Sequence, residues 1–170
     1  MLADQALLTL KRTLLGHPGQ TPVQLELRGP DFRVQLKGEG LRAFLGMIES
    51  FCRTHGDDPA LQEFIAPLRQ HARDWAALSQ DIAARAQASP DEIGAASVDY
   101  LFYSGYVALA YWWARSVAAA DASTQSLDFK AAKRETARFY FARILPRTLA
   151  HRAAIEDGAA TLMALPDEAF

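Results

Sequence analysis

An uncharged stretch from Tyr100 to Ala114, closed by Asp99 and Arg115, limits what this chain can fold into. A membrane-spanning helix needs ~20 consecutive apolar residues, so the stretch is too short to span and predicts a buried helix. Ser89-Pro90-Asp91-Glu92 precedes it as a capping box in which Ser89 caps and Glu92 reaches back. We expect one helix from there to about residue 120. Because its apolar residues cover most of its circumference, it should lie in the middle of a helical bundle.

The rest of the chain predicts shorter elements around that helix. Apolar residues at helical spacing indicate helices over 3–15, 41–52, 58–88 and 127–158. Pro67 should break or kink the third of these near Ala66, Pro146 should kink the last, and Gly158 should end it. Strict alternation over 23–28 and 33–37 indicates a β-hairpin. The predicted fold class is therefore mainly α, a bundle of four to five helices with one small β-hairpin at about residues 23–37.

Composition excludes several classes of function. The chain has 170 residues, a net charge of -2 and a sequence pI near 6.1, which suits one folded domain and gives no basic excess for nucleic acid. Cys52 is the single cysteine, so no intramolecular disulfide can form, and a reducing, cytoplasmic location is expected. Cys52 lies on an apolar stripe, which favours a buried small side chain over a nucleophile.

The sequence carries no recognisable catalytic or metal constellation. Its four histidines are scattered, and neither a nucleophile elbow nor a phosphate-binding glycine loop occurs. Lys130, Arg134 and Arg138 recur at i, i+4 and i+8 and so share one helix face. This basic column either binds a phosphate group of a ligand or is a solvated face. Aromatic residues gather in the central helix, as core, partner surface or pocket lining: Tyr100, Phe102, Tyr103, Tyr106, Tyr111, Trp112 and Trp113.

Several segments resemble a known family. They are DYL at 99–101, VALAY at 107–111, WAR at 113–115, TARFYFARILP at 136–146, IEDGA at 155–159 and LMAL at 162–165. Together they resemble the C-terminal domain of the acyl-CoA dehydrogenase family, in the branch that includes the 3-methylmercaptopropionyl-CoA dehydrogenases. The resemblance is close over 90–170 and holds in outline over 41–88.

The first predicted helix extends the resemblance. Residues 5–14 are similar to the helix that closes the dehydrogenase core, which in the family follows the loop with the catalytic glutamate. The resemblance therefore implies that this chain holds neither that glutamate nor the flavin domain, and no catalytic residue carries over. It divides the chain into residues 1–40, the end of the core helix plus a hairpin insertion, and residues 41–170, the C-terminal helical-bundle domain.

The resemblance implies a function without catalysis by this chain itself. The parent enzyme is an FAD-dependent oxidoreductase, whereas this domain would pack on its core, support subunit association and help shape the acyl-CoA entrance. Lys130, Arg134 and Arg138 are the candidate ligand contacts. The alternative is a free-standing, non-enzymatic dimerisation or binding module that buries its central helix in a homodimer. The expected partner is the rest of a dehydrogenase or a second copy in a homo-oligomer, with no nucleic acid or membrane.

Overall fold

The computed structural model describes residues 38–165, and these residues are mainly helical, as predicted. The predicted helix over 3–15 and the predicted hairpin at 23–37 lie outside the described residues. The chain divides into two units, 1–46 and 47–170, and the packing discussed below lies within the second.

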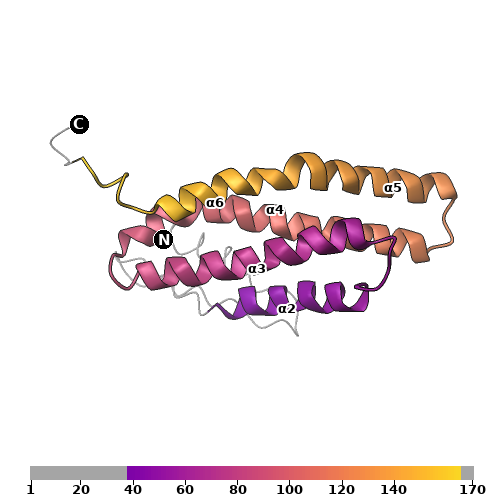
Figure 1. Cartoon of the computed structure of the whole chain (residues 1–170), viewed down its shortest axis with the longest axis horizontal. Coiled ribbons are helices and arrows are strands. Elements are labelled where there is room, and N and C mark those ends of the chain that lie inside the picture. The colour runs from indigo at the N-terminus through magenta and orange to yellow at the C-terminus, as the bar shows by residue number, and fades with distance from the viewer. Residues whose placement is uncertain (1–37, 166–170) are drawn as a thin grey trace, which may run out of the picture. The chain divides into compact units, whose positions relative to one another are not determined.

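The described residues form helical rods joined by short turns (Figure 1). The α2 helix spans Glu39–Thr54, α3 spans Gln62–Arg85 and α4 spans Asp91–Ala122. The last rod consists of α5 (Leu127–Phe139), a π-helical turn (Tyr140–Ile144), a 3-10 turn (Leu145–Arg147) and α6 (Thr148–Asp157). No strand occurs between residues 38 and 165.

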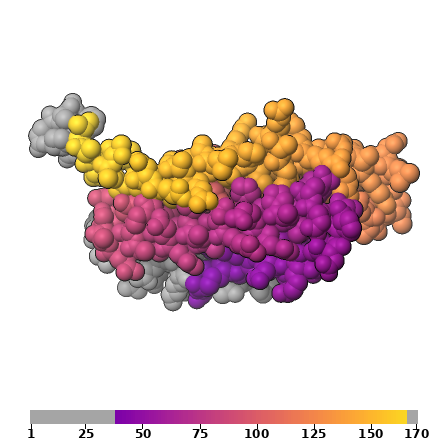
Figure 2. Space-filling model, in the orientation of Figure 1, coloured from indigo at the N-terminus to yellow at the C-terminus, as the bar shows by residue number. Residues whose placement is uncertain are grey.

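The long helix α4 is the centre of this unit, as its even apolar distribution predicted. It packs against α3, α5 and α6, and on the side drawn in Figure 2, α3 and the α5–α6 rod cover most of it. Tyr103, Val107, Ala114 and Val117 on its inner side are at most 1% exposed. No helix in the described part of the chain is long and apolar enough to cross a membrane.

The last turns of α2 join the same core. The ring of Phe51 meets that of Tyr111 edge-on at 5.7 Å between centroids. Arg69 donates a hydrogen bond of 3.0 Å to the carbonyl of Cys52, whose side chain is buried as predicted. Burial raises the pKa of the Cys52 thiol, so the neutral form is favoured and the group is a poor nucleophile.

The two prolines inside predicted helices behave differently. Of the two outcomes expected near Ala66, a kink or a break, the break is wrong, because α3 continues through Pro67, with Phe64, Ile65 and Leu68 buried around it. Pro146 does disturb its helix. It lacks an N–H and lies in the 3-10 turn directly after the π-helical turn, so the change of helix type occurs where an α-helical bond cannot form.

Two predicted helix starts also need correction. Asp58 accepts a hydrogen bond from the Ala60 backbone at 2.9 Å, which closes a turn, and α3 begins later, at Gln62. At α4, Pro90 is the N-cap, no side chain caps the helix, and Ser89 provides only a backbone carbonyl to Glu92. The capping box is therefore not formed.

Glu92 instead belongs to a cluster that holds the end of α6. It pairs with Arg85 at 2.6 Å and accepts a hydrogen bond from the Ala159 backbone at 3.2 Å. Arg85 in turn donates to the carbonyl of Ile155 at 2.8 Å. Gly158, which ends α6 as predicted, has a φ of 78° and lies against this pair. We call Arg85, Glu92 and Gly158 the C-terminal clasp.

Candidate functional site

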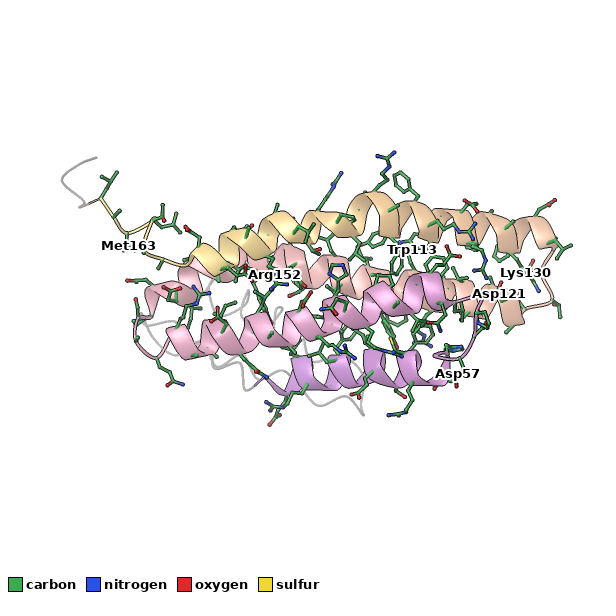
Figure 3. The ribbon with its side chains drawn as sticks, in the orientation of Figure 1. Asp57, Trp113, Asp121, Lys130, Arg152 and Met163 are labelled. Atoms are coloured by element: carbon green, nitrogen blue, oxygen red, sulfur yellow. The ribbon has the colours of Figure 1, made fainter. Side chains whose placement is uncertain are left out.

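The basic column predicted from the sequence lies on α5 and faces other helices of the bundle. Lys130 is near the connection between α4 and α5, where its Nζ donates to the backbone carbonyl of Asp121 at 3.0 Å (Figure 3). Phe129 precedes it, and its N–H is bonded to the Ser126 side chain, which caps α5. The cap fixes where α5 begins and therefore which way the column points.

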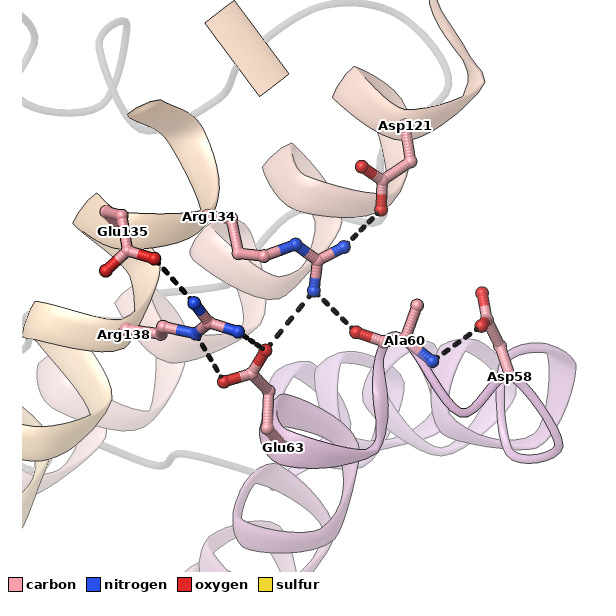
Figure 4. A network of polar contacts seen from close by, with 7 residues as sticks. All are labelled: Asp58, Ala60, Glu63, Asp121, Arg134, Glu135 and Arg138. Atoms are coloured by element: carbon pink, nitrogen blue, oxygen red, sulfur yellow. Dashed lines mark hydrogen bonds and ion pairs between the residues drawn. The ribbon is translucent and has the colours of Figure 1, made fainter. Parts of the chain in front are cut away.

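Arg134 connects three segments of the chain (Figure 4). Its guanidinium pairs with Asp121 at 2.6 Å, contacts Glu63 at 3.3 Å and donates to the carbonyl of Ala60. That carbonyl is oriented by the turn that Asp58 closes. Arg134 therefore joins α5 to the end of α4 and to the start of α3.

Arg138 binds the same glutamate with two parallel hydrogen bonds. Its Nε donates to Glu63 at 2.7 Å and its Nη2 at 2.9 Å, and a third nitrogen bonds Glu135 one turn earlier (Figure 4). Bidentate binding of a carboxylate by arginine is among the strongest polar contacts in proteins. The hydrogen bonds from Arg138, followed by those from Arg134, hold the pKa of Glu63 below its ordinary value.

The sequence analysis did not identify the carboxylates of this network, which are Glu63, Asp121 and Glu135. Glu63 lies 71 and 75 residues before the arginines it binds, and Asp121 lies 13 residues before Arg134, on the preceding helix. The only local signal for Glu63 is that it lies in the first turn of α3, where acidic residues are favoured by the helix dipole. Each guanidinium in the column is thus bonded to a carboxylate, with Arg138 about half exposed and Arg134 mostly covered.

The aromatic group of α4 divides between core and surface. Tyr103 and Tyr111 are buried, and burial raises the pKa of the Tyr103 hydroxyl well above its ordinary range. Trp113 points between α4 and the α5–α6 rod, with its ring centroid 6.4 Å from that of Tyr140 (Figure 3). Phe102 and Trp112 are about half exposed.

Those last two rings belong to a larger apolar surface. The outer face of α4, as we call it, consists of Val98, Leu101, Phe102, Leu109 and Trp112, which are between 49% and 70% exposed. Gly105 lies among them, and no atom lies within 4 Å of where its Cβ would be. Isolated exposed apolar residues are ordinary, whereas a contiguous row along one helix makes this face a candidate interaction surface.

A histidine–aspartate pair lies beside this face. His151 on α6 contacts Asp99 through Nδ1 at 2.7 Å, and the ring of Phe102 stacks on it at 5.2 Å between centroids. The pair ties α6 to α4. Within residues 38–165, no group of three or more histidine, cysteine, aspartate or glutamate residues could hold a metal ion.

Comparison with known proteins gives one match. Residues 44–166 match the sequence model of a family described as acetyl-CoA dehydrogenase C-terminal like. The matched range contains α3, α4, the α5–α6 rod and most of α2, and therefore both the basic column and the outer face of α4. A search of curated proteins found none that matches the chain.

Proposed function

Because the chain belongs to the family of acetyl-CoA dehydrogenase C-terminal-like domains, we propose that it is a non-catalytic association domain of an acyl-CoA dehydrogenase. It packs on a dehydrogenase core, supports subunit association and helps to shape the acyl-CoA entrance. The observation that carries this proposal is the outer face of α4, a row of large apolar side chains on a bundle whose interior is already packed. Such a face is stabilised when another protein surface covers it.

The flavin of the parent enzymes is proposed to bind outside residues 38–165. A flavin dinucleotide needs free donors for its diphosphate, and arginine is the usual choice for such a group. Arg134 and Arg138 already donate to Glu63, Asp121 and Glu135. Arg134 is mostly covered and Arg138 alone is about half exposed, so the pair does not fit a diphosphate, and we derive no flavin chemistry from these residues.

The basic column is proposed to contribute to the acyl-CoA entrance through its exposed end. Arg138 is about half exposed, so an incoming phosphate could share its guanidinium with Glu63. Changing Lys130, Arg134 and Arg138 together to Gln should weaken binding of a CoA thioester to the assembled enzyme. Glu63→Gln is the matched control, because it removes the competing carboxylate, keeps all three cations and should not weaken binding. Equal affinity in wild type and the triple variant would leave the column a structural network.

The absence of catalysis is tested on the purified chain. We expect no turnover when it is incubated with FAD, a series of acyl-CoA thioesters and an artificial electron acceptor. Reduction of the acceptor that depends on the thioester would contradict the proposal.

An antibody against this chain then gives the size of the native protein in extracts of its source. A band several times heavier than 18.7 kDa supports a domain of a larger flavoenzyme.

A free-standing dimerisation module is the second candidate function. The outer face of α4 favours it equally, because a second copy could cover that face as well as a dehydrogenase core could. A native band at 18.7 kDa would select this function, and the search would then turn to partners of the chain.

A further inference from the structure

Four of the five residues of the outer face of α4, all except Phe102, follow a two-fold pattern in the sequence. Leu101 and Leu109 lie four residues before and after Gly105, and Val98 and Trp112 lie seven residues before and after it. At 3.6 residues per turn, all of these positions fall within roughly 40° of Gly105 around the helix. Two copies of α4 packed antiparallel across Gly105 would therefore place Leu101 of one copy against Leu109 of the other, and Val98 against Trp112.

We propose that the outer face of α4 is an isologous homodimer interface, in which two α4 helices cross antiparallel at Gly105. The inference rests on the proposed function, since it names a second copy of this chain as the associating partner and specifies the contact. A two-fold axis pairs each residue with a different residue of the other copy, except at the axis itself. A row that is symmetric about one central residue meets that requirement.

Gly105 suits the crossing point. It lies in the interior of α4, where glycine is less favourable than alanine, and the described part of the chain contains nothing that fills the space beside it. The bundle itself thus offers no reason for a glycine there. In a helix crossing, a residue without a side chain lets two backbones approach closely, so that the flanking leucines interdigitate.

Area and charge agree with this arrangement. Taking ~150–250 Å² for a fully exposed large side chain, the five residues present roughly 500 Å² per copy, or about 1,000 Å² for two. This meets the lower limit for a biological interface and suits a weak, reversible dimer. No charged residue occurs between Asp99 and Arg115. The antiparallel register places exposed Arg115 opposite Ala95, one turn from exposed Asp91 of the other copy.

The mass of the full chain in solution, measured by sedimentation velocity over a dilution series, tests the contact. Wild type should be a dimer that dissociates on dilution, and Leu101→Glu should raise the dissociation constant about 30-fold or more, as loss of a central contact does. Leu149→Glu is the matched control, because Leu149 on α6 is equally large, 65% exposed and off the outer face. It should leave the dissociation constant within about twofold.

Cysteine cross-linking tests the register. With Cys52 replaced by Ala, a mixture of Leu101→Cys and Leu109→Cys chains should form mixed disulfides on mild oxidation, and neither chain alone should cross-link efficiently. Efficient cross-linking of Leu101→Cys with itself would indicate parallel helices and overturn the proposal. A circular dichroism spectrum of each variant confirms that it is folded.

The outcomes separate the two proposals. A wild-type dimer that Leu101→Glu leaves intact would overturn the α4 interface, while self-association through another surface would stand. A wild-type chain that is monomeric at about 100 μM would overturn the α4 homodimer, and with it self-association of this chain. Packing on a dehydrogenase core would then be tested by the native size alone.

Discussion

Gly158 is the residue on which the end of α6 most depends. Its φ of 78° and ψ of -160° suit glycine, and a Cβ there would lie 2.5 Å from Arg85 Nη1 and 2.9 Å from Glu92 Oε2. Both atoms belong to the ion pair of the C-terminal clasp, which also holds the Ile155 carbonyl and the Ala159 N–H. The IEDGA segment that carries part of the family resemblance thus has a structural explanation.

Gly158→Ala should therefore lower the free energy of unfolding by about 1–3 kcal/mol, because it combines backbone strain with displacement of a partly buried ion pair. Gly46→Ala is the control, since Gly46 lies in helix α2 with nothing within 4 Å of its Cβ position. That change should raise stability by about 0.5–1 kcal/mol. Urea denaturation measures both, and equal effects of the two variants would contradict the role of the clasp.

Glu63 gives the network of α5 a pH dependence. Since its folded pKa is lowered from the ordinary value of 4.5, its pairing stabilises the protein fully above that value. The contribution is lost as pH falls through the lowered folded pKa. Over a third of the side chain is exposed, so the effect is about 1 kcal/mol or less. The difference in urea midpoint between wild type and Glu63→Gln should shrink from pH 6 to pH 3, and a constant difference would argue against this pairing.

At the scale of elements, local sequence patterns predicted which segments are helical more accurately than they predicted where each helix begins. The spacing of apolar residues predicted α4 and the whole α5–α6 rod, because burial of one face fixes that spacing. The capping box at Ser89 does not form because the Glu92 carboxylate binds other groups. One is Arg85, on the preceding helix, and the other is the N–H of Ala159, which is distant in sequence, so no local pattern predicts this outcome. The basic column was placed on one helix face correctly, yet its partner Glu63 lies in the first turn of α3, 75 residues before Arg138.

Ser126 and Ser89 allow a direct comparison between a cap that forms and a predicted cap that does not. Ser126 has an extended backbone conformation and accepts a hydrogen bond from the Phe129 N–H, so Ser126→Ala should lower the free energy of unfolding by about 1 kcal/mol. Ser89 makes no side-chain cap at α4, and Ser89→Ala should change stability by less than about 0.5 kcal/mol. Thermal unfolding of the two variants measures both. Equal losses would mean that the capping box forms in solution.

At the scale of the whole molecule, the core of the helical bundle is built from segments spread from α2 to α6. Ile48, Leu68, Val107, Leu145 and Ile155 are each at most 1% exposed. These side chains come from every rod, so the bundle should unfold as one cooperative unit rather than helix by helix. The sequence predicted this class of fold because apolar stripes recur in each segment.

A chain limited to residues 41–170 should therefore keep a helical circular dichroism spectrum and a single cooperative thermal transition. It corresponds to the C-terminal domain predicted from the sequence and contains all of the residues that match the family. The full chain is the reference for both measurements. A fragment with helical signal but a broad, non-cooperative transition would mean that the first 40 residues complete the core.

The π-helical turn at Tyr140–Ile144 has a consequence for the length of the chain. Such a turn holds one residue more than the α-helical turn it replaces, and two of its five members, Ala142 and Arg143, are exposed and supply nothing to the core. Loss of either residue would replace the π-helical turn with an α-helical one and keep α5 and α6 facing α4, while the 3-10 turn at Pro146 would remain. The chain should thus tolerate the loss of one residue here without a change in how the helices of the bundle pack.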